Sequence, residues 1–268
     1  MKQLLVISLL LGLVPAPTFA RIWTVNEDGS GDAPNLYAAM DSAATGDSVL
    51  VSPGHYALPT GLLVSGVRLI GANGPAETHI EVLANDAFTS GITLRARLEG
   101  IHVYGVSNIA IVLLDGGEID NCVIEVIEGQ GGLPHAVTIY GPSSISRSLV
   151  ANGEINIYSL VEFSYNIIVA DLDASAPNCC SFFSNDVFGE ISPNITIGTQ
   201  DLNFFLDPQF CGIPGSGNYY LKSTSPCLSE NNPYGVPLAV GPLGLGCGAV
   251  SVKSTTWGSI RTMYKDKR

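Results

Sequence analysis

The chain has 268 residues, of which only 13% are charged, and its 12 Lys and Arg residues against 24 Asp and Glu residues give a formal net charge of −12. The basic residues are scattered and form no basic stripe with interleaved aromatic residues, so we expect no nucleic-acid partner. The 30 glycines, 16 prolines and many short β-branched runs favour an all-β chain.

Residues 1–20 have the features of a signal peptide. Lys2 precedes an apolar run from Leu4 to Val14, and small residues surround the expected cleavage point after Ala20. The run is shorter than the roughly 20 apolar residues that span a bilayer, and no later run is long enough. We therefore expect a secreted or cell-surface protein without membrane insertion, with a retained membrane anchor as the alternative.

Residues 21–56 read as an N-terminal cap and first coil. A strand is predicted over Ile22–Val25, a helix over Asn35–Ala44 with Asn35 as its N-cap, and a second strand over Val49–Val51. A helix followed by a buried strand suits one end of a solenoid, because the first coil otherwise exposes apolar side chains and unpaired strand edges.

Residues 57–205 contain two interleaved sets of short apolar segments. The first set starts near Leu98 (LEGIHV), Ile119 (IDNCVI), Ile145 (ISRSLV) and Phe163 (FSYNIIV); the second starts near Ile92, Ile109, Val137, Ile155 and Cys180. This pattern predicts two strands per repeat of about 20 residues or a little more, stacked as coils of a single-domain, monomeric solenoid. A β-sandwich is the alternative, but few hairpin-type turns are present.

The six cysteines are expected to include disulfides if the chain is exported. Cys122 lies in an apolar run and is predicted to be a buried free thiol. We expect Cys227 to pair with Cys247, and Cys211 to pair with Cys179 or Cys180. No histidine stands near the cysteines at a zinc-binding spacing.

Several segments resemble a known superfamily. The stretch DGSGD, a helix, GDSVLV and PGHY resembles the opening of pectin-lyase-like proteins, and DNCVIEV and FSYNIIV resemble their strand-and-bend units. From Cys179 on, the segments CCSFFSNDVFG, DPQFC, GNYYLKSTSPC and GCGAV resemble the closing part of exported bacterial β-helix proteins, and residues 206–250 are expected to form the C-terminal closing segment. The tail, residues 251–268, resembles a linker before an immunoglobulin-like sorting module. The resemblance implies a single-stranded right-handed parallel β-helix, but it implies no particular activity, because the superfamily includes lyases, hydrolases, esterases and non-enzymatic adhesins.

An acidic and basic cluster is the candidate catalytic site. The repeat register places Glu99 and Asp120 at equivalent outward positions on adjacent coils, with Arg147 and His102 beside them. Two close carboxylates could bind calcium or divide acid and base roles, whereas scattered outward charges on a solenoid are usually a solvated face. Asp171 and Asp173, expected in a loop, are a second candidate calcium site.

The sequence lacks the motifs that carry catalysis in polygalacturonases, pectin methylesterases and pectate lyases. The four histidines are separated along the chain, and each is expected to be a loop or surface residue. Tyr104, Tyr140 and Tyr158 are candidate sugar-stacking residues, with Tyr140 and Tyr158 at equal positions on adjacent coils. We expect a scaffold for surface attachment or carbohydrate binding without a recognisable catalytic site. The alternative is a polysaccharide lyase or hydrolase acting on acidic glycans, with calcium as its cofactor.

Overall fold

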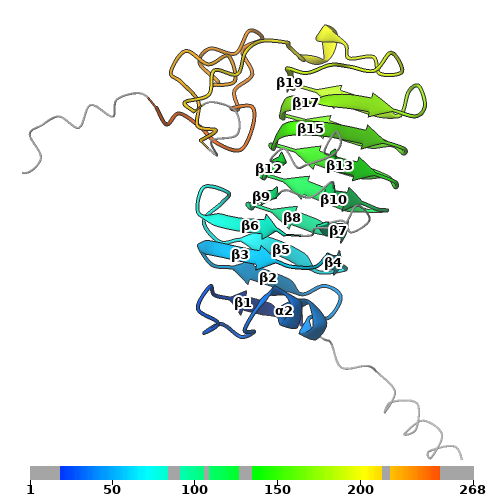
Figure 1. The fold of residues 1–268 in the computed structure, drawn as a ribbon. Coiled ribbons are helices and arrows are strands. Elements are labelled where there is room, and N and C mark those ends of the chain that lie inside the picture. Colours follow the sequence, from blue (N-terminus) through cyan, green and yellow to red (C-terminus); the bar gives the residue numbers. More distant parts are fainter. Residues whose placement is uncertain (1–18, 84–90, 106–108, 127–134, 213–217, 248–268) are drawn as a thin grey trace, which may run out of the picture.

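The computed structural model describes residues 19–83, 91–105, 109–126, 135–212 and 218–247, and these form a solenoid-like stack of parallel β-coils (Figure 1). Sheet A contains, in spatial order, β1 (Ile22–Val25), β2 (Ser48–Val51), β5 (Arg68–Gly71), β8 (Arg97–Glu99), β11 (Gly117–Asp120), β14 (Ser143–Ser146), β16 (Val161–Ser164) and β18 (Cys180–Phe183).

Sheet B contains, in spatial order, β3 (Gly54–Leu58), β6 (Thr78–Val82), β9 (His102–Gly105), β12 (Val123–Val126), β15 (Leu149–Ile157), β13 (His135–Ile139), β10 (Ile109–Leu113), β7 (Ile92–Arg95) and β4 (Leu62–Ser65), with β17 (Ile167–Ala174) and β19 (Asp186–Val187) continuing from β15. The paired strands of both sheets are parallel, which a β-sandwich built from hairpins would not give.

The core lies inside the coils, where equivalent residues of successive strands form apolar ladders. In sheet A the inward ladder is Leu69, Leu98, Ile119, Ile145, Phe163 and Phe182. All six are buried, and the Phe163 and Phe182 rings stack with centroids 4.8 Å apart. Each coil can bury its inner face only against its neighbours, so stacking supplies the hydrophobic free energy.

The segments predicted as single strands of the first set are corners between the two sheets. LEGIHV, for example, contains the end of β8, a bend at Gly100 and the start of β9. The backbone φ of Gly100 is 67°, a left-handed conformation that turns the chain out of one sheet and into the other. In the second set, Ile111 and not Ile109 aligns with Ile92 and Val137, and the strand at Cys180 belongs to sheet A.

The N-terminal elements are as predicted. Helix α2 (Leu36–Ser42) is capped by Asn35, whose Oδ1 accepts a hydrogen bond from the Ala38 amide at 2.9 Å. Leu36 and Ala39 are buried in the core, and α2 lies at the first coil (Figure 1).

The C-terminal segment, residues 204–212 and 218–247, packs against the side of the coils. A second apolar cluster joins it to outward-facing residues of sheet B; its members are Val123, Leu149, Ala151, Ile167, Phe204, Tyr219, Leu221, Cys227, Leu228 and Val240. Figure 1 shows this segment beside the later coils. Among the residues described, no helix has the length and apolarity needed to cross a membrane.

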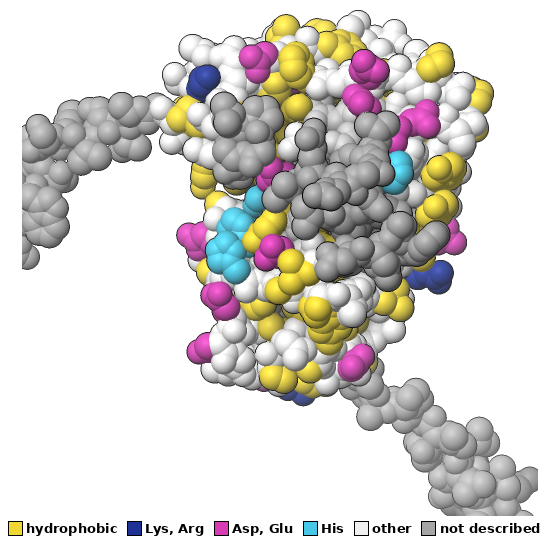
Figure 2. Space-filling model, viewed as in Figure 1, with side chains coloured by type: hydrophobic (Ala, Val, Ile, Leu, Met, Phe, Trp, Pro, Cys, Tyr) yellow, Lys and Arg dark blue, Asp and Glu magenta, His cyan; other side chains and the backbone are white. Residues whose placement is uncertain are grey.

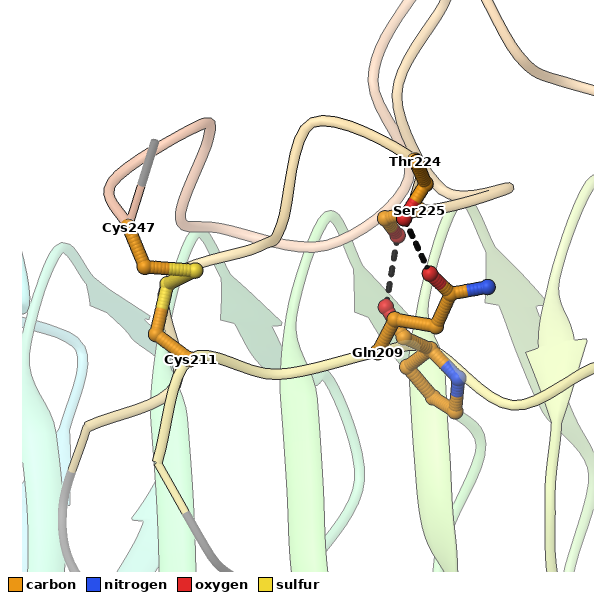
Figure 3. Close-up of a disulfide and its surroundings, with 6 residues drawn as sticks. Gln209, Cys211, Thr224, Ser225 and Cys247 are labelled. Atoms are coloured by element: carbon orange, nitrogen blue, oxygen red, sulfur yellow. Dashed lines mark hydrogen bonds between the residues drawn. A yellow bond between two sulfur atoms is a disulfide. The ribbon is translucent and has the colours of Figure 1, made fainter. Parts of the chain in front are cut away.

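The disulfide pairing differs from the prediction. Cys211 is bonded to Cys247, with Cα atoms 5.3 Å apart (Figure 3). Backbone bridges from Leu221 to both Phe210 and Leu245 bring the two cysteines together. Cys227 is instead a buried free thiol at the contact between the C-terminal segment and the coils, where its Sγ donates a hydrogen bond to Asp186 at 3.1 Å. Cys179 and Cys180 are also free thiols. Cys122 is a buried free thiol, as predicted.

Candidate functional site

The candidate catalytic cluster is an ion-pair network on the outer face of sheet A. Asp120 aligns with Glu99 on one side and with Ser146 on the other. Arg97 and Arg147 both pair with the Asp120 carboxylate, and Ser146 Oγ donates to it at 2.9 Å. Glu99 Oε2 is 2.9 Å from Arg97 Nε.

These contacts leave Asp120 poorly suited to proton transfer. Burial raises the pKa of its carboxyl, but hydrogen bonds from Arg147 and Ser146 and the charges of both arginines more than offset that effect, so the pKa lies below its ordinary value. The carboxyl therefore stays ionised at neutral pH, and its oxygens are occupied by the guanidinium groups. The predicted neighbour His102 lies on sheet B, because the corner at Gly100 separates it from Glu99.

The three candidate tyrosines occupy two different surfaces. Tyr140 and Tyr158 stack with ring centroids 5.2 Å apart and planes at 9°, and both are more than half exposed. Each ring therefore has one face taken by the other, which leaves less of the pair for stacking on a sugar. Tyr104 lies on β9, at the opposite side of sheet B.

Asp171 and Asp173 lie on strand β17 and not in a loop. Asp171 Oδ1 accepts a hydrogen bond from the Glu190 amide at 2.9 Å. Within the described part of the chain, no group of three or more His, Cys, Asp or Glu side chains is arranged to hold a metal ion.

Sheet B carries a polar surface that we call the histidine strip, made of His55, His79, Glu81, His102, Tyr104 and Glu125. These side chains point outward from β3, β6, β9 and β12, because inward residues alternate with them along each strand. The strand register aligns His55, His79 and His102 in one row, and Glu81, Tyr104 and Glu125 in the next.

The rings of the strip pack on one another. The His55 and His79 centroids are 4.7 Å apart, and those of His79 and His102 are 5.1 Å apart. The Tyr104 ring centroid lies 5.3 Å from that of His102, and the Tyr104 and His79 rings meet edge to face. The strip thus presents aromatic surface with ring nitrogens, a phenol and a carboxylate, which together can donate and accept hydrogen bonds.

The histidine row changes to apolar residues where the C-terminal segment covers it. From His102 the row continues through Val123, Leu149 and Ile167, all of which the segment buries. The apolar residues therefore have their partner within the chain, whereas His55 is exposed and His79 and Tyr104 are half-buried.

His102 and Glu125 lie at the boundary between the exposed part of the strip and the surface that the C-terminal segment covers. His102 Nε2 is 3.4 Å from Glu125 Oε2, and both side chains are almost fully buried. Burial raises the pKa of Glu125, but its interactions with His102 and Tyr219 outweigh burial and lower the pKa. Glu125 Oε1 and His102 Nε2 have no hydrogen-bond partner within the described residues, so two polar atoms at this end of the strip are unsatisfied.

A pocket of about 370 Å³ lies at the other end of the strip. Its lining includes His55, Ala57 and Leu58 of β3, together with Glu27 and Tyr37 of the N-terminal cap. The strip and the pocket therefore form one continuous surface through His55, running from the cap to the C-terminal segment.

Charge is divided between the two sheets. Arg68, Arg97 and Arg147 all form their ion pairs on sheet A. In Figure 2, histidines gather beside aspartate and glutamate side chains, with no lysine or arginine among them on this face. Within the described residues Glu81 forms no ion pair with a lysine or arginine, and its charge helps to raise the pKa of Tyr104 after burial, the larger cause.

The sequence pattern suggests four unrelated histidines, but in the structure three of them lie together. His55, His79 and His102 are separated by 24 and 23 residues, which is one coil each, so that spacing was the available indication. His135 lies apart on β13, 3.2 Å from Glu154. Glu81, Tyr104 and Glu125 lie 23 and 21 residues apart, again one coil each, so the same spacing was available for them.

No protein-family model, curated protein or solved structure matches this chain.

Proposed function

We propose that this protein is an exported right-handed parallel β-helix of the pectin-lyase-like class that binds a glycan along the histidine strip. The proposed fold is supported by parallel coils with apolar ladders inside, and export is supported by the pattern of residues 1–20. The observation that carries the binding proposal is the set of accessible rings on three successive coils, His55, His79 and Tyr104, which continues into a pocket at His55.

A repeating surface suits a repeating ligand. The His55 and His79 rings lie 4.7 Å apart along the stack, and Tyr104 continues the accessible surface onto the next coil, so ring groups on successive coils meet successive units of a polymer. Tyr104 contributes a phenol and aromatic surface, and sugars combine hydroxyl groups with apolar ring faces. On this proposal the ion-pair network at Asp120 stabilises sheet A and takes no part in binding.

The test is a binding screen of the purified protein against neutral, acidic and cationic polysaccharides, with and without calcium. We expect retention on at least one immobilised glycan, with neither new reducing ends nor unsaturated products. Tyr104→Ala should weaken retention about fivefold, given the ~1 kcal/mol that one aromatic contact contributes. Tyr158→Ala is the matched control and should bind as the unmodified protein does.

Two results would overturn the proposal. Absence of binding across the panel would remove glycan recognition. Cleavage products would show that the protein is an enzyme. If a chelator abolished them, Glu99 and Asp120 would be the first residues to mutate.

A further inference from the structure

We infer that the ligand of the histidine strip is a glycan whose repeating units carry a protonated amine, that is, a cationic amino-sugar polymer. This inference rests on the proposed glycan-binding function and adds the charge class of the ligand. It follows from the charges that face the strip, from the neutral His79 ring within it and from the unsatisfied carboxylate at its end.

Glu81 in the strip and Glu27 at the pocket form no ion pair within the described part of the chain. Glu81 stands beside Tyr104 and forms no ion pair there with lysine or arginine, and Glu27 lines the pocket at the cap. The ion-paired arginines lie on sheet A, so their charges do not offset these carboxylates at close range. A polyanionic glycan would be repelled here, whereas an ammonium group would be attracted.

The histidine stack is compatible with a cation at neutral pH. Burial lowers the pKa of His79, and the charges of His102 and His55 lower it further, against a hydrogen bond from the His79 ring to the Ala76 carbonyl oxygen, which raises it. The His79 ring is therefore neutral near pH 7 and can accept a hydrogen bond from an ammonium group.

The aromatic and buried polar groups add specific contacts. A cation above a tyrosine ring is attracted by the ring quadrupole, and Tyr104 lies between Glu81 and Glu125 in the same outward row. Glu125 Oε1, buried and without a hydrogen-bond partner among the described residues, is an acceptor at the end of that row. A ligand amine or hydroxyl at this end would satisfy it.

The experiment compares three oligosaccharides of equal length by calorimetry: a glucosamine oligomer, its N-acetylated counterpart and a galacturonate oligomer. We expect the glucosamine oligomer to bind at least about tenfold more tightly than the N-acetylated one, because a charge-assisted hydrogen bond is stronger than a neutral one. The galacturonate oligomer should not bind.

Glu81→Gln should weaken binding of the glucosamine oligomer about tenfold and leave the N-acetylated oligomer unaffected. Glu162→Gln is the matched control: it removes the same charge from an exposed position on sheet A and should change neither affinity. Thermal unfolding of both variants checks that they fold.

The outcomes separate the two proposals. Equal or tighter binding of the N-acetylated or galacturonate oligomer would overturn the amino-sugar inference and leave glycan binding intact. An unchanged affinity in folded Glu81→Gln would overturn the assignment to the strip. If the protein binds none of the three oligomers and no polysaccharide in the screen, the glycan-binding function itself is overturned.

Discussion

At the residue scale, corners of the stack are made by residues with a positive φ. Gly100, Asn121, Arg147, Tyr165 and Ser184 each lie between a strand of sheet A and one of sheet B or its continuation, and Leu202 has the same conformation after the short 3-10 helix Thr199–Asp201. Only glycine adopts this conformation without steric cost, and asparagine tolerates it better than most residues. At Arg147 the same corner carries a guanidinium group that pairs with Asp120. The residue type therefore predicts the corner conformation at Gly100 and Asn121, but not at the other four positions.

A buried carboxyl beneath the C-terminal segment gives a prediction at this scale. Burial raises the pKa of Asp186 from 3.8 to about 7, against hydrogen bonds from the Leu206 amide and Cys227 Sγ. Below about pH 4 the carboxyl is protonated in the folded and unfolded chain alike. Between pH 4 and 7 only the unfolded chain loses the proton, so the free energy of unfolding falls with rising pH, by about 4 kcal/mol in total.

Urea denaturation from pH 4 to 8 measures this effect. Asp186→Asn should remove that part of the pH dependence, and Asp173→Asn, an exposed aspartate on β17, should retain it. Identical pH profiles for the unmodified protein and Asp186→Asn would contradict the assignment.

At the element scale, a ladder of buried asparagines follows three corners. Asn166, Asn185 and Asn203 are fully buried, and each side-chain amide donates to a backbone carbonyl of the neighbouring coil. The Asn185 Oδ1 atom accepts from the Asn166 backbone amide at 3.0 Å, and Asn203 Oδ1 accepts from the Asn185 backbone amide at 2.9 Å. The ladder satisfies backbone groups that the corners leave without sheet partners.

Asn185→Ala should lower the free energy of unfolding by about 2 to 4 kcal/mol, because it leaves buried groups of two adjoining coils without partners. Asn73→Ala is the control, since the Asn73 side chain is exposed and, among the described residues, forms a hydrogen bond with Glu77 alone. The control should change stability by less than about 0.5 kcal/mol. Chemical denaturation measures both, and an equally small change for Asn185→Ala would show that the ladder is not needed.

At the scale of the whole molecule, the chain separates its surfaces by the way its coils stack. One side of sheet B is covered by the C-terminal segment, another part exposes the histidine strip, and sheet A holds the arginine pairs. Because the formal net charge is −12, long-range attraction adds to the local charges when a cation approaches.

The affinity for a glucosamine oligomer should therefore fall about tenfold as sodium chloride rises from 20 to 300 mM, since salt shortens the range of charge interactions. Affinity for an N-acetylated oligomer of the same length should be unaffected by the same change. Calorimetry at several salt concentrations measures both slopes. Equal slopes would show that charge does not contribute to recognition.

The sequence by itself determined the repeat, the N-terminal strand and helix with its Asn35 cap, the inward ladder from Leu98 to Phe163, and the stacked Tyr140 and Tyr158. These features depend on local patterns or on a fixed offset between coils, and both can be read along the chain. The register also placed Glu99 next to Asp120 correctly.

Only the tertiary structure decided which polar groups meet across coils. In the folded chain Cys211 is bonded to Cys247, and the Asp120 carboxylate forms ion pairs with Arg97 and Arg147. The rings of His55, His79 and His102 form one stack. Coil lengths vary, and each corner changes the sheet to which the next residue belongs, so a small error in register moves a side chain to another surface. The path of the C-terminal segment over the outer face depends on the apolar surface that all the coils create together, which no single stretch of sequence contains.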